Sequence, residues 1–504
     1  MTQEYDVVVV GAGNAGLCAA LAAQETGARV LVLEKAPVEE RGGNTAFTGG
    51  LLRFPFESID DFRPLVPDFS EDELAGLDVG RYTKRDYAND LDRVTEELSD
   101  PDMVEILTGQ AYQTMRWMRE RGVRWLFAIG RQSYLDPSTA KRKFFGNLIL
   151  EANGGGQGLS DYLFTAIEKG GIDVAYETKA VRLLVNDQGT ITGIQVRDTA
   201  GQRAIRSRAV VLAAGGFEAN REMRTRYLGP DWELAKVRGT RFNTGDGIRM
   251  ALEIGAQPFG HWSCCHAVAW NLMAGDVGDR TIGDLHQKHS YPIGIIVNRD
   301  GKRFVDEGAD FRNYTYAKYG REILKQPRRQ AFQIFDRKTL DLLRDEYGRR
   351  DEASGRIPPY VTKVKANTID ELADGLMIDP VQLKRTVDEF NAAIQPGDFN
   401  PSILDGKHTE GITPPKSNWA ISIDEPPFEG YAVTCGITFT FGGLRINKQG
   451  QVLDTEDHPL PGLYAAGELV GGLFYYNYPG GSGLMAGAVF GRLAGTSAAK
   501  AATG

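Results

Sequence analysis

The first 34 residues alternate between apolar and mixed stretches in the order strand, helix, strand. Residues 6–10 are mostly Val, residues 14–26 are rich in Ala and Leu, and residues 28–33 are again mainly apolar. A short apolar run predicts a buried strand, whereas a longer run with scattered polar positions predicts a helix. Gly27 marks the end of that helix. We therefore predict a β-turn-α-β unit at this end of the chain.

Similar patterns continue along the chain, with one stretch of different character in the middle. Residues 81–123 and 378–394 predict helices, and a Pro-rich connector follows the second. A helix at 159–169 precedes predicted strands at 172–176, 180–185, 191–197 and 209–213. Residues 231–350 hold four of the six His, whereas residues 430–504 return to Gly-rich α/β character. We predict one domain formed by residues 1–230 and 365–504, and a second domain inserted at 231–364.

Composition and charge narrow the class of protein. A chain of 504 residues exceeds what one compact core usually fills, which agrees with two domains. The formal charge of −9 and the lack of a Lys/Arg block argue against nucleic-acid binding. The first apolar run, at 7–10, is far too short to span a membrane, and no signal peptide is evident. We expect a cytoplasmic protein without a direct membrane span.

The four Cys residues give no support for a metal site. Cys18, Cys264, Cys265 and Cys435 form no C-x-x-C pair, which argues against zinc, iron–sulfur and attached haem. Reduced thiols are usual in the cytoplasm, and we expect them here. The adjacent Cys264 and Cys265 could form a strained disulfide, but we do not expect one.

The turn between the first strand and the first helix has the sequence Gly11-Ala-Gly13-Asn14-Ala15-Gly16. In such a motif the first glycine permits the tight turn, the second lets the backbone approach a pyrophosphate, and the third lets strand and helix pack closely. Free N–H groups and the helix dipole favour the negative charge there. Glu34 ends the second strand 18 residues after Gly16, where an acid binds ribose hydroxyls. Together these features predict a Rossmann-type dinucleotide site.

Further Gly-rich segments distinguish FAD from a nicotinamide cofactor. They lie at 41–50, 210–217 and 464–468, which places them at strand ends over the whole chain. A long, extended FAD needs contacts so widely spread, whereas NAD(P) typically uses one contiguous half-domain. We therefore predict FAD and no bound NAD(P). Besides the motif residues, the predicted contacts in and near these segments are Lys35, Gly43, Gly49, Ala214, Gly215 and Gly467.

Several short motifs, in their order along essentially the full chain, resemble the flavoprotein family of succinate dehydrogenase and fumarate reductase. The likeness is carried by GGNT at 42–45, CHAV at 265–268, IVNRDGKRF at 296–304, TPPKS at 413–417, CGITFT at 435–440 and VFGRLAG at 489–495. Within this family the sequence resembles the FAD-dependent tricarballylate dehydrogenases. The resemblance implies an α/β fold, in which a Rossmann-type FAD-binding domain carries an inserted α+β capping domain. The active site would lie between the two domains.

The resemblance also implies which residues contact FAD. These are Glu34, Asn44, Thr45, Gly50, Val181, Asp246, Glu468 and Leu484, with Val181 contacting the adenine through its backbone. Ser482, Gly483 and Leu484 would open the last helix, whose N–H groups would face the flavin edge where negative charge accumulates on reduction. Membrane-bound relatives tether FAD to a His near the position of Asn44. This chain has no His before His261, so we expect non-covalent FAD.

The resemblance places a proton-transfer group in the middle of the chain. Forming or reducing a C=C bond needs a hydride exchanged with the flavin, a proton exchanged with a protein group, and a polarised carbonyl or carboxylate. In relatives the proton group is an Arg shortly after R-F-V-[ND]-E. Here that segment is 303–307, and Arg312 follows one residue later than the family spacing, at which Phe311 stands. A guanidinium is a poor base, so the role requires a relay to Glu307 or Asp310. The alternative for Arg312 is a surface ion pair.

Three further residues complete the predicted catalytic set. His266 matches a substrate-binding His of the family, with a core histidine as the alternative. A second family His and an Arg that binds a substrate carboxylate are absent, and Tyr478 stands at the place of the Arg. A Tyr before Pro-Gly there is similar to the 3-ketosteroid Δ1-dehydrogenases, in which it hydrogen-bonds the ketone. Tyr316 adds a second phenol, for which aromatic packing is the alternative.

These features predict an FAD-dependent dehydrogenase. It would introduce a double bond α,β to the carbonyl or carboxyl group of a small ketone or a tricarballylate-like acid. Reduced flavin would then pass electrons to a separate acceptor. The same site could run in reverse, as a soluble fumarate or enoate reductase. A non-catalytic flavin-binding protein is a third alternative, which an open flavin face without Arg312 and Tyr478 would favour.

Overall fold

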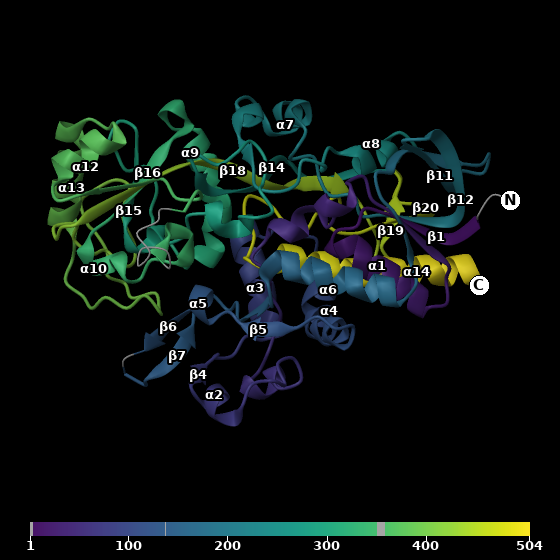
Figure 1. The fold of residues 1–504 in the computed structure, drawn as a ribbon, viewed down its shortest axis with the longest axis horizontal. Coiled ribbons are helices and arrows are strands. Elements are labelled where there is room, and N and C mark those ends of the chain that lie inside the picture. Colours follow the sequence, from purple (N-terminus) through teal and green to yellow (C-terminus); the bar gives the residue numbers. More distant parts are fainter. Residues whose placement is uncertain (1–3, 137, 350–357) are drawn as a thin grey trace.

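The computed structural model describes residues 4–136, 138–349 and 358–504. Figure 1 shows two groups of strands at opposite ends of the longest axis, with both chain termini beside one of them. Strands β14 (Pro258–Asn271) and β18 (Phe428–Leu444) lie between the two groups. The described chain therefore has two large sheets, and the long strands β14 and β18 of one of them run toward the middle of the molecule.

The sheet nearest the termini has eight strands in the order β10-β11-β12-β1-β2-β9, with β20 on β12 and β19 on β20. Its bounds are β1 Glu4–Val10, β2 Val30–Leu33, β9 Asp173–Ala175, β10 Lys179–Val185, β11 Ile191–Asp198, β12 Gly201–Leu212, β19 Gln451–Leu453 and β20 Pro459–Ala465. β1 pairs in parallel with β2 and β12, and β12 pairs in parallel with β20. The carboxyl ends of these parallel strands meet at one edge, where ligands of such sheets bind.

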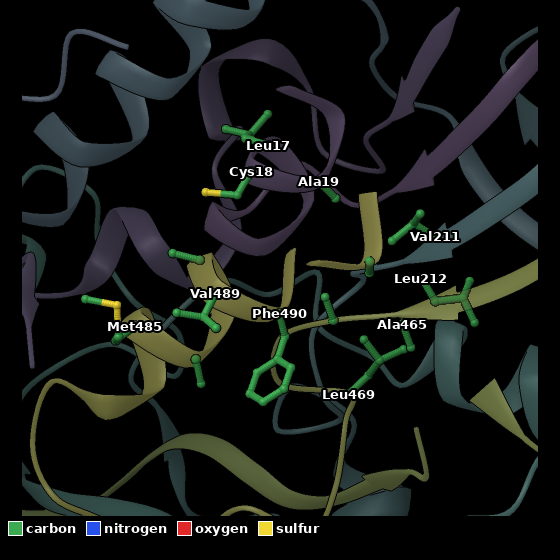
Figure 2. Packing of buried hydrophobic residues seen from close by; sticks show 14 of the residues in the cluster. Leu17, Cys18, Ala19, Val211, Leu212, Ala465, Leu469, Met485, Val489 and Phe490 are labelled. Atoms are coloured by element: carbon green, nitrogen blue, oxygen red, sulfur yellow. The ribbon is translucent and has the colours of Figure 1, made fainter. Parts of the chain in front are cut away.

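Two helices from opposite ends of the chain, α1 (Asn14–Glu25) and α14 (Ser482–Thr503), pack on this sheet and against each other. A Cβ on Gly491 of α14 would lie 2.3 Å from the Ala15 carbonyl oxygen, and one on Gly495 would lie 2.1 Å from the Ala19 oxygen. The glycines therefore allow an approach that larger residues would prevent. Figure 2 shows the buried cluster at this contact: Leu17, Cys18 and Ala19 of α1, Met485, Val489 and Phe490 of α14, Val211 and Leu212 of β12, Ala465 of β20, and Leu469.

The second sheet has six strands in the order β13-β18-β16-β15, with β14 and β17 also paired with β18. The remaining bounds are β13 Lys236–Val237, β15 Ile295–Asn298, β16 Ala331–Phe335 and β17 Lys363–Ala366. Helix α9 (Tyr316–Leu324) packs on β14, and α12 (Ile369–Leu376) and α13 (Pro380–Ala393) share a hydrophobic cluster with β15, β16 and β18. This sheet continues past residue 364 as far as Leu444. The predicted domain division stays a prediction, and the strand pairing favours a later end of the inserted part.

The predicted helical stretch at 81–123 forms two helices, α3 (Lys84–Thr95) and α4 (Pro101–Glu120). Glu96 and Glu97 between them have positive φ values of 57° and 61°, and Asp100 caps α4. The predicted helix at 159–169 begins earlier, as α6 (Gly155–Lys169). The predicted strand at 209–213 is the end of the longer β12, because the first half of β12 pairs with β11 in an antiparallel ladder. Local patterns thus located the elements, and tertiary pairing set their bounds.

Short elements complete the described chain and supply part of the cavity wall. Two three-stranded sheets have the orders β3-β8-β5 and β4-β7-β6. The strands are β3 Leu51–Leu52, β4 Leu77–Asp78, β5 Trp125–Phe127, β6 Ser133–Asp136, β7 Lys141–Phe144 and β8 Leu150–Ala152. The short helices are α2 Glu71–Ala75, α5 Ile129–Gln132, α7 Arg221–Leu228, α8 Asp246–Leu252 and α10 Arg337–Leu340.

Candidate active site

A cavity of about 260 Å³ extends from the β1–α1 turn to β18 and α9. Its wall contains most of the predicted FAD residues: Gly11, Gly13, Asn14, Ala15, Glu34, Lys35, Gly43, Asn44, Thr45, Gly49, Ala214, Gly215, Asp246, Gly467, Glu468, Gly483 and Leu484. Gly16, Gly50, Val181 and Ser482 are not part of this wall, although Ala180, beside Val181, is. Direct FAD contacts stay predictions for all of these residues, and the cavity gives these four no support.

The phosphate-binding turn has the shape that its motif predicts. Gly11 has a φ of +105°, and a Cβ on it would lie 2.3 Å from the Ala213 carbonyl oxygen. A Cβ on Gly16 would lie 1.9 Å from the Gly11 oxygen, so the protein's own packing requires both glycines. Gly13 differs, because the nearest atom to its Cβ would be Thr45 Oγ1, at 3.7 Å, and the residue faces the cavity. The open side at Gly13 and the N-terminus of α1 fit a pyrophosphate.

Charged side chains surround the cavity beyond this turn. The buried carboxylate of Glu34 accepts hydrogen bonds from two backbone N–H groups, at 3.0 and 2.7 Å, and burial raises its pKa. Asp246 pairs with Lys35 at 2.9 Å and with Lys179 at 2.7 Å. Burial opposes ionisation of Asp246, but the hydrogen bonds from the two lysines lower its pKa. Glu34 thus stands where the motif expects the ribose acid, and this end fits the adenosine part of a dinucleotide.

Asn14 joins three segments that the sequence assigned to FAD. Its backbone N–H donates to Thr45 Oγ1 at 3.0 Å, and its Nδ2 group donates to the Leu484 carbonyl at 2.7 Å. The turn at 11–16, the loop at 41–50 and the start of α14 therefore meet at one point. A single extended ligand can contact all three.

Two glutamates form a buried pair beside the same cavity. Glu468 lies on the wall and accepts a hydrogen bond from the Thr440 N–H at 2.9 Å, while Glu218 lies behind it with 0% exposure. Nδ2 of Asn243 is 2.7 Å from Glu218 Oε1 and 3.4 Å from Glu468 Oε2, so the two carboxyl groups are neighbours. Asn44 also donates to Glu218, at 2.7 Å. Burial raises both pKa values, and the neighbouring carboxylate raises that of Glu468 further, so the pair retains a proton.

The other end of the cavity carries two phenols. The hydroxyl groups of Tyr316 and Tyr478 are hydrogen-bonded to each other, and both side chains lie on the wall. Burial raises both pKa values, and the positive charge of the nearby Arg238 opposes this shift. Both phenols are therefore neutral and able to donate hydrogen bonds. The structure brings together two residues that lie 162 positions apart.

His266 lies behind this pair and is not part of the wall. Its ring centroid is 5.0 Å from that of Tyr316, 4.8 Å from that of Tyr478 and 5.1 Å from that of Phe439. Neither ring nitrogen has a hydrogen-bond partner among the described residues. Burial, and then the charge of Arg238, hold its pKa well below the usual range, so the ring is neutral. Substrate binding by His266 stays a prediction, and its position favours support of the tyrosine rings.

Arg312 lies on the cavity wall, with a relative exposure of 9%. Its guanidinium donates to the Arg131 carbonyl oxygen and is 3.8 Å from the Glu346 carboxylate. The alternative of a surface ion pair is therefore wrong. Burial lowers the pKa of Arg312, which the charge of Glu346 opposes.

The structure gives no support to the expected relay from Arg312 to Glu307 or Asp310, which stays a prediction. Glu307 is fully buried and forms an ion pair with Arg303, while Asp310 forms one with Arg93. Nearness in sequence suggested these two acids, but each is neutralised by a different arginine. The carboxylate that faces Arg312 comes from a later segment of the chain.

The polar residues on the wall that carried no motif include Arg131, Arg238, Asp284 and His289. Asp284 accepts hydrogen bonds from both Arg131 and Arg238. The His289 ring lies edge-on to Tyr316, with centroids 4.7 Å apart. The concentration of His between 231 and 350 was a weak signal for His289, whereas the arginines stood in no recognisable pattern.

Several other features have little bearing on the site. All four Cys are buried and free, Cys264 and Cys265 included. Within the described ranges, no group of His, Cys, Asp and Glu could hold a metal ion. None of the helices that the structure describes combines the length and the apolar character needed to cross a bilayer.

Comparison with known proteins agrees with this geometry. The profile of the FAD binding domain family matches residues 6–484. A urocanate reductase from Eggerthella lenta is 30% identical over a match that covers 99% of this chain and 75% of the length of that reductase. A 3-oxosteroid 1-dehydrogenase from Mycolicibacterium smegmatis is 30% identical over 98% of this chain and 96% of its own. The open conformation of a flavocytochrome c3 fumarate reductase is 27% identical, with a TM-score of 0.72, over 100% of this chain and 79% of its own.

These matches confirm the α/β fold with a Rossmann-type FAD-binding part and a capping part, and they confirm FAD as the cofactor. The narrower likeness to tricarballylate dehydrogenases stays a prediction. The chain belongs to the FAD binding domain family and is an FAD-dependent oxidoreductase of the group that contains fumarate reductases and 3-oxosteroid dehydrogenases.

Proposed function

We propose that the enzyme introduces a C=C bond α,β to a carbonyl group, with Tyr316 and Tyr478 as the groups that act on that carbonyl and its α-proton. The observation that carries this proposal is the pair of neutral, hydrogen-bonded phenols on the cavity wall. The similarity to a 3-oxosteroid 1-dehydrogenase supports a ketone substrate. Non-covalent FAD, a separate electron acceptor and a cytoplasmic location belong to the same proposal.

The chemistry follows from what a phenol can do as a hydrogen-bond donor and, once ionised, as a base. Tyr478 donates a hydrogen bond to the carbonyl oxygen, which polarises the carbonyl and acidifies the neighbouring C–H group. For dehydrogenation Tyr316 must first release its own proton to solvent, and its phenolate, which the charge of Arg238 stabilises, then accepts the proton of that carbon. When bound, FAD supplies the hydride exchange at the next carbon. Because the pKa of Tyr316 is raised, loss of its proton is costly, so dehydrogenation should become faster as pH rises.

The reverse reaction, reduction of an enone or enoate, is the second candidate. It is favoured by the positive charge of Arg131, Arg238 and Arg312 on the wall, which suits a carboxylate. A urocanate reductase and a probable fumarate reductase are among the related proteins. A raised tyrosine pKa also suits a group that delivers a proton. The redox potential of the acceptor decides between the two directions.

The test is substitution of the phenols. Tyr478→Phe and Tyr316→Phe should retain FAD but slow its anaerobic reduction by a saturated ketone about 10²- to 10³-fold, the usual effect of removing one such donor. Tyr476→Phe is the matched control, because Tyr476 is 38% exposed and lies outside the cavity wall. Normal rates in both active-site variants would contradict the proposal.

A further inference from the structure

A second, smaller cavity of about 30 Å³ adjoins the first. His289 and Arg312 line both cavities, so these two side chains form the partition between them. The rest of the wall consists of Tyr134, Phe145, Ser290, Pro292, Ile293, Phe311, Arg344, Pro401 and Trp419. Because His289 also contacts Tyr316, the second cavity begins directly behind the tyrosine pair.

Aromatic rings form a continuous side of this cavity. Tyr134 stacks on Phe145 with centroids 5.4 Å apart, and Phe145 stacks on Phe311 at 5.9 Å. Phe311 in turn contacts Trp419 at 5.7 Å. The Arg344 guanidinium lies 4.1 Å above the Tyr134 ring, which holds its planar group in place. These side chains therefore pack against one another, so the shape of the second cavity is fixed before a ligand binds.

The charges on the wall are all of one sign. Arg312 and Arg344 line the cavity, and none of the other lining residues is a carboxylate. Among the described residues, the Arg344 guanidinium donates only to the Gly130 and Ser133 carbonyl oxygens, and no carboxylate forms an ion pair with it. Its charge also helps to lower the pKa of Arg312, after burial, so each guanidinium is within reach of the other's field.

A bound anion would offset the positive charge on the wall of the second cavity. Arg312 already has the Glu346 carboxylate at 3.8 Å, whereas Arg344 has no acidic partner among the described residues. A carboxylate between the two guanidinium groups would compensate the charge of Arg344 and accept charge-assisted hydrogen bonds from both. Nε2 of His289 is buried and has no hydrogen-bond partner among the described residues, so it can act as a third polar contact. A water molecule needs about 10–15 Å³ of such space. The second cavity can therefore hold a carboxylate group of a ligand but is too small for a ring of that ligand.

We propose that this second cavity binds a carboxylate of the substrate, remote from the reacting carbonyl, through Arg312 and Arg344. The assignment rests on the proposed function and narrows it: the substrate is an oxo acid, with its ketone at Tyr316 and Tyr478. Arg312 is then a substrate-binding residue at the partition, which agrees with the lack of structural support for its expected proton relay. Arg344 sets the preference for acids over neutral ketones.

The test compares oxo acids with their methyl esters. The probes are 4-oxopentanoate, 5-oxohexanoate and 4-oxocyclohexanecarboxylate, each with its ester, titrated into the FAD-loaded enzyme and followed through the flavin spectrum. For at least one spacing the acid should bind at least tenfold more tightly than the ester, which corresponds to about 1.4 kcal/mol. Arg344→Met should remove this preference without changing ester affinity, and Arg344→Lys should keep part of it. Arg385→Met, an exposed substitution on α13, should change neither affinity.

The possible failures are distinguishable. If acids and esters bind equally while the ketones still reduce the flavin, the second-cavity assignment is overturned and the proposed function stands. If added acetate restores acid-like affinity to an ester, the cavity binds free anions, and the assignment to the substrate is overturned. If no ketone perturbs or reduces the flavin, the proposed function fails and the assignment fails with it.

Discussion

The two ends of the main cavity are built in different ways. At the nucleotide end, the turn at 11–16 and Glu34 lie close together in the sequence, and the turn offers mainly backbone groups. At the substrate end, Arg131, Tyr316 and Tyr478 come from three distant segments and act through their side chains. Backbone shape therefore governs cofactor binding, whereas a few side chains govern the reaction. The first end should be sensitive to added volume at glycines, and the second to removal of single polar groups.

The largest effect is expected from Gly16→Ala in α1. The added methyl group would lie 1.9 Å from the Gly11 oxygen, a backbone atom that cannot move unless the turn opens. We expect at least a 100-fold loss of FAD affinity and a loss of about 3 kcal/mol of stability. Gly109→Ala in α4 is the matched control, because its Cβ would meet only the flexible Lys84 side chain, at 3.4 Å. Fluorescence titration of the apoprotein measures the affinity, and equal FAD binding by both variants would refute the prediction.

A medium effect on the free energy of unfolding, which depends on pH, is expected from Glu218→Gln. In the unfolded chain the pKa of a glutamate side chain is about 4.3. The folded pair keeps a proton to higher pH because both pKa values are raised. Above about pH 4.3 the folded state therefore binds more protons than the unfolded state, and stability falls as pH rises toward the folded pKa. A Gln amide imitates the protonated carboxyl group and keeps the acceptor that Asn243 uses.

The variant should therefore gain stability relative to the unmodified enzyme as pH rises. The gain is at most about 1.4 kcal/mol per pH unit while the folded pair holds one proton that the unfolded chain has lost. Urea unfolding between pH 5 and 8, at a fixed excess of FAD, measures it. Glu389→Gln on the exposed face of α13 should show no such trend. A constant stability difference across this range would contradict the prediction.

The smallest effect is expected from Lys179→Ala at the nucleotide end. The ion pair of Lys179 with Asp246 is partly exposed, with side-chain exposures of 29% and 17%, and such pairs contribute at most about 1 kcal/mol. Lys35 still holds Asp246 in the variant. We expect FAD affinity to fall by less than about fivefold, as measured by the same titration. A 100-fold loss would show that side chains govern this end too, and the comparison of the two ends would fail.

The same contrast explains what the sequence could predict. The G-x-G-x-x-G turn, Glu34 and the start of α14 could be located because fixed spacing and local pattern define them. Tyr316 and Tyr478 were identified singly, but their contact depends on how α9 packs on β14 beside the loop before α14. Arg238 follows β13, which pairs with β18, so its place at the cavity depends on pairing between distant strands. Glu346 could not be identified as the partner of Arg312, because chain proximity pointed to acids that bind other arginines.

The central claim is that the tyrosine pair acts on a carbonyl group. Its most direct test is the anaerobic absorbance of the oxidised flavin after addition of saturated ketones and oxo acids, or of tricarballylate and other tricarboxylates. We predict that a ketone or oxo acid bleaches the flavin of the unmodified enzyme and fails to do so at a comparable rate in Tyr478→Phe. Bleaching by a tricarboxylate while all ketones are inert would contradict the claim. Such a result would assign the reaction to the arginines of the substrate end.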